Sequence, residues 1–149
     1  MEFVDFIVQN GAPARVNENL EELWKRIVFS IAVSNSDDHL RNHGFLWAKS
    51  GGWTLSPTYD LNPTPTDVKS RHLSMSIDLD DNTCSVELLQ EAAGYFGLEL
   101  RAAREIIREV GKVTATWRAV AEEVGARRSE TARMASAFEH DDLRSALHL

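Results

Sequence analysis

The sequence of 149 residues contains a single cysteine, Cys84, so no disulfide can form within the chain. This is typical of proteins in a reducing compartment. No apolar run approaches the roughly 20 residues that a membrane-spanning helix needs. The first residues carry acidic side chains where a secretory signal would carry basic ones. We therefore expect a cytoplasmic protein without membrane contact, in which Cys84 is a small buried apolar residue.

Clustered positive charge is also scarce. The chain has 16 Lys and Arg against 23 Asp and Glu, which gives a formal net charge of −7. Because binding to DNA or RNA depends on neutralising phosphates, we expect no direct contact with nucleic acid. Hydrophobic residues make up 43% of the sequence, which is enough for one domain with its own core. We therefore treat residues 1–149 as a single domain.

Apolar periodicity predicts a mainly helical fold. Apolar side chains recur with i, i+3, i+4, i+7 spacing, which is typical of helices with one buried face. Asn17 or Asn19 is expected to cap the second helix, and Ser129 the last. Gly111 is a possible kink in the fourth, whose apolar stripe is expected to lie in the core. The predicted helices cover residues 2–9, 19–34, 86–96, 99–124 and a segment after 129.

A small β hairpin is predicted between the helices. Residues 43–48 and 53–55 are largely apolar and aromatic, and they flank a turn with the sequence KSGG. Residues 73–77 alternate apolar and polar side chains, which indicates a further strand, and residues 78–82 indicate a turn. The expected fold class is therefore mainly α with a small inserted hairpin.

The segment at residues 35–42, NSDDHLRN, carries most of the chemistry. Asp37 and Asn42 are separated by five positions, and Asp60 follows beyond the predicted hairpin. Protein kinases use the same order: a base aspartate, a metal-binding asparagine five residues later, and a second metal-binding aspartate. Phosphoryl transfer needs one carboxylate to accept a proton and oxygen ligands to hold Mg²⁺. On these residues alone, Asp37 and Asn42 could equally be capping or turn residues.

A family resemblance makes the kinase interpretation more specific. NSDDHLRNHGF at residues 35–45 and LSPTYDLNPTP at residues 55–65 resemble the C-terminal domain of HipA-type serine/threonine kinases. In that family N-x-D-x-H-x-K/R-N is followed by a hairpin and then by P-x-Y-D. The resemblance implies a protein-kinase-like C-terminal lobe.

The resemblance also implies roles for individual residues. Asp37 falls on the catalytic base, and Asn42 and Asp60 fall on the Mg²⁺ ligands. Asp38 falls on a variable position without an assigned role. A structural role remains open for His39 and Tyr59. The positions that the resemblance assigns to ATP binding are His39, Arg41, Asn42, Tyr59 and Asp60.

The sequence lacks a phosphate-binding loop and a lysine on a strand, both of which kinases need. We therefore expect this lobe to require an N-terminal ATP-binding lobe or a complementing chain, and to be inactive by itself. The resemblance implies a toxin with a helix-turn-helix antitoxin partner and a substrate such as an aminoacyl-tRNA synthetase. Homodimerisation through an apolar patch is also expected, because the surface that normally packs against the other lobe would be uncovered.

Two other functions remain open. One is a non-catalytic fragment or pseudokinase that binds a protein partner. The other is a metal-dependent hydrolase that uses Asp37, Asp38, His39 and Asp60. Adjacent aspartates do not readily point into one site, which disfavours the hydrolase.

Overall fold

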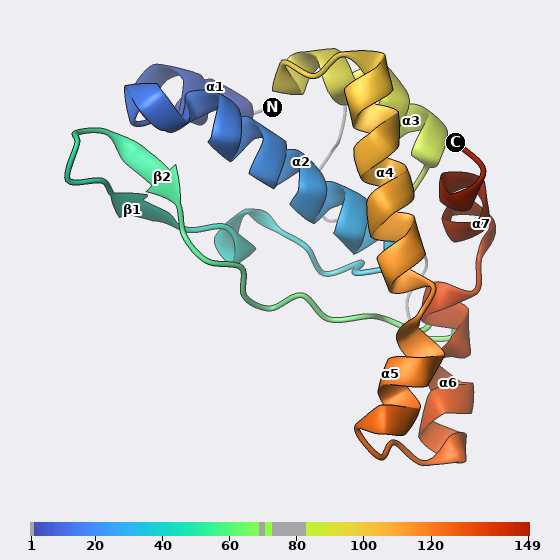
Figure 1. Ribbon diagram of the computed structural model, residues 1–149. Helices are drawn as coiled ribbons and strands as arrows, with labels where there is room; N and C mark the ends of the chain where they lie inside the picture. The colour runs from blue at the N-terminus through green and yellow to red at the C-terminus, as the bar shows by residue number, and fades with distance from the viewer. Residues whose placement is uncertain (1, 69–70, 73–82) are drawn as a thin grey trace.

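The computed structural model describes residues 2–68, 71–72 and 83–149. The described part is mainly helical with one small antiparallel hairpin, as predicted (Figure 1). The strand predicted at residues 73–77 and the turn predicted at 78–82 lie outside the described residues. None of the described helices is both long and apolar enough to cross a membrane.

The core forms around two long helices, α2 (Val16–Ala32) and α4 (Leu100–Thr114), which pack side by side (Figure 1). Trp24 of α2 is fully buried and lies 5.2 Å from the ring of Phe96. Phe96 ends the segment formed by α3 (Val86–Ala92) and the 3₁₀ helix η3 (Ala93–Phe96). Gly97 stops this segment with φ of 69°, which agrees with the end of the helix predicted at residues 86–96. Cys84 is buried, which confirms that prediction.

The N-terminal residues position the hairpin. Helix α1 (Glu2–Asn10) and the 3₁₀ helix η1 (Pro13–Arg15) precede α2. Strand β1 (Phe45–Trp47) pairs with β2 (Trp53–Leu55) in the register Phe45–Leu55. The N–H of Ala12 donates to the carbonyl of Trp53 at 2.8 Å. A Cβ at Gly52 would lie 2.6 Å from the nitrogen of Ala12, so only glycine fits this approach.

Asn19 is not the helix cap that the sequence suggested. It lies inside α2 and is buried, and its Oδ1 accepts hydrogen bonds from the Thr54 hydroxyl at 2.9 Å and the Leu55 N–H at 3.2 Å. A polar residue in a buried helix position is stable here because it pairs with strand β2. Asn19 therefore fastens the hairpin to α2.

The long helix predicted at residues 99–124 is interrupted. Helix α4 ends at Thr114, and α5 (Trp117–Glu123) begins after a turn in which the Thr116 hydroxyl donates to the Val113 carbonyl at 2.7 Å. Gly111 is not a kink: it lies within α4, where a Cβ would come 3.1 Å from the Cβ of Ala146. It therefore allows close packing against α7 (Asp141–Leu147).

Beyond this break the apolar stripe does not lie in the core, contrary to the prediction. Val120 of α5 and Val124, the residue that follows this helix, are 50% and 76% exposed, and Val113 in the last turn of α4 is already 67% exposed. Helix α6 (Arg128–Phe138) packs on α5, with the ring of Phe138 stacked on Trp117 at 4.5 Å. Ser129 lies inside α6 and is not its cap; the Glu130 carboxylate instead accepts a hydrogen bond from the N–H of Arg127.

Candidate functional site

The candidate site forms where the segment after α2 meets the segment after the hairpin. At the end of α2, Ser34 adopts a left-handed backbone conformation with φ of 54°. The N–H of Asn35 then bonds to the Ser30 carbonyl at 2.7 Å. A single 3₁₀ turn, η2 (Leu40–Asn42), leads into β1. Figure 1 shows this segment leaving α2 toward the hairpin and the chain after β2 running back along it.

Asn42 and Asp60 meet across these two segments. The Asn42 Nδ2 donates to the Asp60 Oδ2 at 3.0 Å, although the residues are 18 positions apart. Asn42 is 4% exposed, and its buried Oδ1 has no hydrogen-bond partner among the described residues. Asp60 is exposed and has φ of 59°, which few non-glycine residues adopt. Its other oxygen accepts from the Asn62 amide at 2.7 Å.

Tyr59 provides a second connection between the same segments. Its hydroxyl donates to the backbone carbonyl of Arg41 at 2.9 Å. The N–H of Ser56 also donates to the Gly44 carbonyl at 2.8 Å, and the Arg26 guanidinium donates to the Ser56 carbonyl at 2.6 Å. Tyr59 is 46% exposed, so it is not a core residue. The backbone before Asp60 is thus held to both the loop and α2.

The remaining predicted site residues lie on the same loop. Asp37 and Arg41 are exposed, and His39 is half-buried. The Nδ1 atom of His39 is buried and makes no hydrogen bond within the described part of the chain. The structure therefore places Asp37, His39 and Arg41 on one short loop and joins Asn42 to Asp60 by a direct contact.

The donor atoms of this site fit a hard oxygen-binding cation. Within residues 2–68, 71–72 and 83–149, no three His, Cys, Asp or Glu side chains come close enough to hold a metal ion. The Asn42 amide contacts the Asp60 carboxylate through Nδ2, its Oδ1 is unpartnered among the described residues, and both side chains carry oxygen atoms that can bind a cation. Mg²⁺ is commonly held by one or two protein ligands, with phosphates and water completing its shell. The oxygen donors of Asn42 and Asp60 are of the type that Mg²⁺ prefers.

Asp38 is a residue that the sequence left without a role. It is fully buried, and its carboxylate accepts from the Ser30 hydroxyl at 2.8 Å and bonds to the His43 ring at 2.9 Å. The signal that could have found it is spacing: Asp38 and His43 repeat the Asp37–Asn42 interval one position later.

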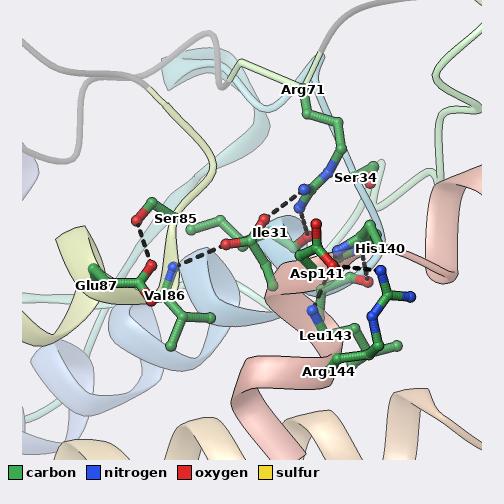
Figure 2. Close-up of polar contacts among 12 residues, drawn as sticks. Ile31, Ser34, Arg71, Ser85, Val86, Glu87, His140, Asp141, Leu143 and Arg144 are labelled. Carbon is green, nitrogen blue, oxygen red and sulfur yellow. Dashed lines mark hydrogen bonds and ion pairs between the residues drawn. The ribbon is translucent and has the colours of Figure 1, made fainter.

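A second polar cluster contacts the end of α2 (Figure 2). The guanidinium of Arg71 donates to the Ser34 hydroxyl at 3.0 Å and to the Ile31 carbonyl at 3.3 Å, and it pairs with Asp142 at 2.5 Å. A cation is favourable there because the last carbonyls of a helix lack intrahelical donors. The other Asp142 oxygen accepts from the N–H of Val86 at 3.1 Å. This cluster therefore joins α2, α3 and α7.

Two titratable groups in this cluster have shifted pKa values. Burial raises the pKa of the Cys84 thiol to about 11, against a smaller opposing effect of Arg71. Burial, followed by the charge of Arg71, lowers the pKa of His140. His140 donates from Nε2 to the Ala32 carbonyl at 3.1 Å and accepts at Nδ1 from the N–H of Leu143. These two hydrogen bonds form together only when the ring is neutral, because a protonated ring has no acceptor nitrogen.

A comparison with protein families identifies the chain. Residues 1–117 match the model of the HipA-like C-terminal domain. The chain belongs to this family. The match covers the candidate loop, the hairpin and α4, and it ends at the first residue of α5. No curated protein and no solved structure matches the chain.

Proposed function

We propose that this HipA-like domain is the catalytic lobe of a serine/threonine protein kinase, which transfers the γ-phosphoryl group of Mg·ATP to a protein hydroxyl. The contact between Asn42 and Asp60 carries the proposal, because it joins the two expected metal ligands and leaves the Asn42 Oδ1 unpartnered among the described atoms. The matched family supports it, since HipA-like proteins are associated with kinase activity.

In this proposal each residue of the site has its own role. Asp37, which is exposed, orients the substrate hydroxyl and accepts its proton. Asn42 and Asp60 hold Mg²⁺, which neutralises charge on the phosphates. Tyr59 fixes the backbone before Asp60 through its bond to the Arg41 carbonyl. His39 and Arg41 contact the nucleotide.

The proposal includes partners. The phosphates of ATP would also be gripped by an N-terminal lobe or a complementing chain, which would pack on this kinase-like C-terminal lobe. The biological role would be that of a toxin, with a helix-turn-helix antitoxin and a protein substrate such as an aminoacyl-tRNA synthetase. The proposal also includes a homodimer.

A second candidate function is that of a non-catalytic protein-binding module. An apolar groove of about 420 Å³ favours it. The groove is open to solvent between α5, α6 and the end of α2, and its lining includes Val33, Trp117 and Phe138. Exposed apolar surface of this kind is typical of interaction sites.

Calorimetric titration of Mg·ATP into the chain tests the metal site. We expect binding by the wild type and its loss in Asp60→Ala, because one of two protein ligands is removed. Asp67→Ala is the matched control, since Asp67 is an exposed carboxylate a few residues further along the same segment. Equal binding by wild type and Asp60→Ala would contradict the metal site. No binding by the wild type would show that the chain is only a scaffold half, as expected of a binding module or of a lobe completed by an N-terminal lobe or another chain.

A further inference from the structure

Asp38 is a carboxylate in the protein interior. It is 0% exposed, as is Ser30, and His43 is 6% exposed. The Ser30 hydroxyl donates to its Oδ2 at 2.8 Å, and the His43 Nε2 lies 2.9 Å from its Oδ1. A buried carboxylate is costly unless donors satisfy it, and here each oxygen has one. Since the carboxylate accepts, the hydrogen of the His43 ring is assigned to Nε2.

The Asp38–His43 contact closes the loop that carries the proposed site. Asp38 directly follows Asp37, and His43 directly follows Asn42. Between them the chain makes one 3₁₀ turn, in which the N–H of Asn42 donates to the His39 carbonyl at 2.8 Å. Asp37 is exposed and Asp38 is buried, so the two neighbours point in different directions. The contact between the residues that follow Asp37 and Asn42 therefore restrains how far apart those two residues lie in space.

The closed loop is also anchored to the core. Ser30 lies in the last turn of α2, and its hydroxyl is 3.5 Å from the Nδ2 of Asn35 as well as bonded to Asp38. From the opposite side, the Phe3 ring of α1 packs on the His43 ring at 5.3 Å. Both ends of the loop are therefore fixed relative to helices α1 and α2.

Stability alone does not explain a charge at this position. Well-packed apolar residues often replace a buried charged pair without loss of stability, whereas a hydrogen-bonded pair fixes one arrangement of its partners. We propose that Asp38 and His43 form a positioning pair, which sets the separation of Asp37 and Asn42 for Mg²⁺ binding and phosphoryl transfer. This inference rests on the proposed function, and neither residue of the pair touches the nucleotide.

The first test compares two substitutions of His43. His43→Gln keeps an N–H donor near the position of Nε2, whereas His43→Leu has similar bulk and no donor. Residues that orient metal ligands typically contribute 10- to 100-fold to metal affinity. We expect His43→Leu to weaken Mg·ATP binding by at least about tenfold, and His43→Gln to stay within about threefold of the wild type. Equal weakening by both would contradict the proposal.

The double variant Asp38→Leu/His43→Leu separates positioning from stability. It replaces the polar pair by an apolar one, so its unfolding midpoint should lie close to that of the wild type and above that of His43→Leu. Its affinity for Mg·ATP should nevertheless remain at least about tenfold lower. Wild-type affinity in a folded double variant would overturn the inference. If either leucine variant does not fold, Asp38→Asn serves, because it keeps an acceptor for Ser30 and removes the acceptor for His43.

A readout without nucleotide keeps this test independent of the proposed function. The side-chain amide of Asn42 donates to Asp60, so its NMR signals report the geometry of the site directly. We expect these signals to shift in the double variant and to stay near their wild-type positions in His43→Gln. Unchanged Asn42 signals in the double variant would refute the positioning pair even if the wild type bound Mg·ATP. Shifted signals in a protein that binds no Mg·ATP would support the pair and contradict nucleotide binding by this chain alone.

Discussion

Two polar clusters flank the end of α2, and they differ in how completely their atoms are paired. In the candidate site, the Asn42 Oδ1 has no partner in the described chain, and Asp60 has φ of 59°. In the cluster around Arg71, the guanidinium makes three contacts and both Asp142 oxygens accept hydrogen bonds. Unpaired polar atoms are typical of places where a ligand binds, whereas full pairing is typical of structural contacts.

The two clusters are joined through Ser34. Its hydroxyl accepts from Arg71 and donates to the Ala137 carbonyl at 2.9 Å. Ser34 also has φ of 54°, and the candidate loop follows it directly. The Arg71 cluster therefore fixes the backbone at Ser34, which leads directly into the loop of the candidate site.

The largest expected effect comes from removing Asp142. Asp142→Ala leaves the Arg71 guanidinium without its ion pair and the Val86 N–H without its acceptor, in a region where both charged side chains are mostly buried. We expect the free energy of unfolding to fall by about 3 kcal/mol, measured by urea denaturation. Asp141→Ala is the control, since Asp141 is 93% exposed. An equal loss in the two variants would show that the Arg71 cluster is no more structural than the surface.

A smaller effect on stability, in this case a gain, is expected from glycine at position 60. Asp60→Gly removes a side chain from a left-handed backbone position, whereas Asp60→Ala keeps a Cβ there. We expect the glycine variant to be about 1 kcal/mol more stable than the alanine variant, and neither to bind Mg·ATP. Thermal unfolding and calorimetry measure the two properties. A glycine variant less stable than the alanine variant would mean that Asp60 is not strained.

The smallest effect is a pH dependence from His140. Its pKa is lowered in the folded protein by burial and then by Arg71, from a value of 6.5. The unfolded chain therefore takes up a proton first as the pH falls below about 6.5, and stability is lost on the acid side and fully present above it. Denaturation at pH 7.5, 6.5 and 5.5 should show a steeper loss in the wild type than in His140→Asn, which can still cap α7. Parallel curves would exclude His140 as the source.

Local signals were sufficient to predict much of the fold. The helix that precedes the loop, the hairpin and the stop at Gly97 depend on apolar spacing, turn residues and glycine, all of which are local in sequence. The family was predicted from NSDDHLRN and the residues around Asp60, and the match over residues 1–117 confirms it. The sequence placed Asn42 and Asp60 in one site, and the two side chains are in contact. Their roles as metal ligands stay predictions.

Features that depend on distant residues were not predictable. The partners of Arg71 include Asp142, which is 71 positions away, and no periodicity indicates such a pair. Asn19 reads as a helix cap in sequence but bonds to β2, 35 and 36 positions away. The stripe of α4 continues in sequence through α5, but the turn at Thr116 directs the second half away from the core. The burial of Asp38 depends on Ser30 and His43, whose meeting requires the folded loop.

The cross-connections beside the hairpin have a consequence for how this domain tolerates change. Three hydrogen bonds join the segment that precedes β1 to the segment that follows β2: Tyr59 to Arg41, Asn42 to Asp60, and Ser56 to Gly44. These bonds close the hairpin off as a loop of its own. The entropic cost of closing a loop rises only with the logarithm of its length, so lengthening the hairpin tip costs little free energy. Gly52 is fixed by Ala12, but a Cβ at Gly51 would meet no atom within 4 Å. Residues inserted between Ser50 and Gly51 would extend outward, so this tip is a natural place for a recognition element or an engineered label.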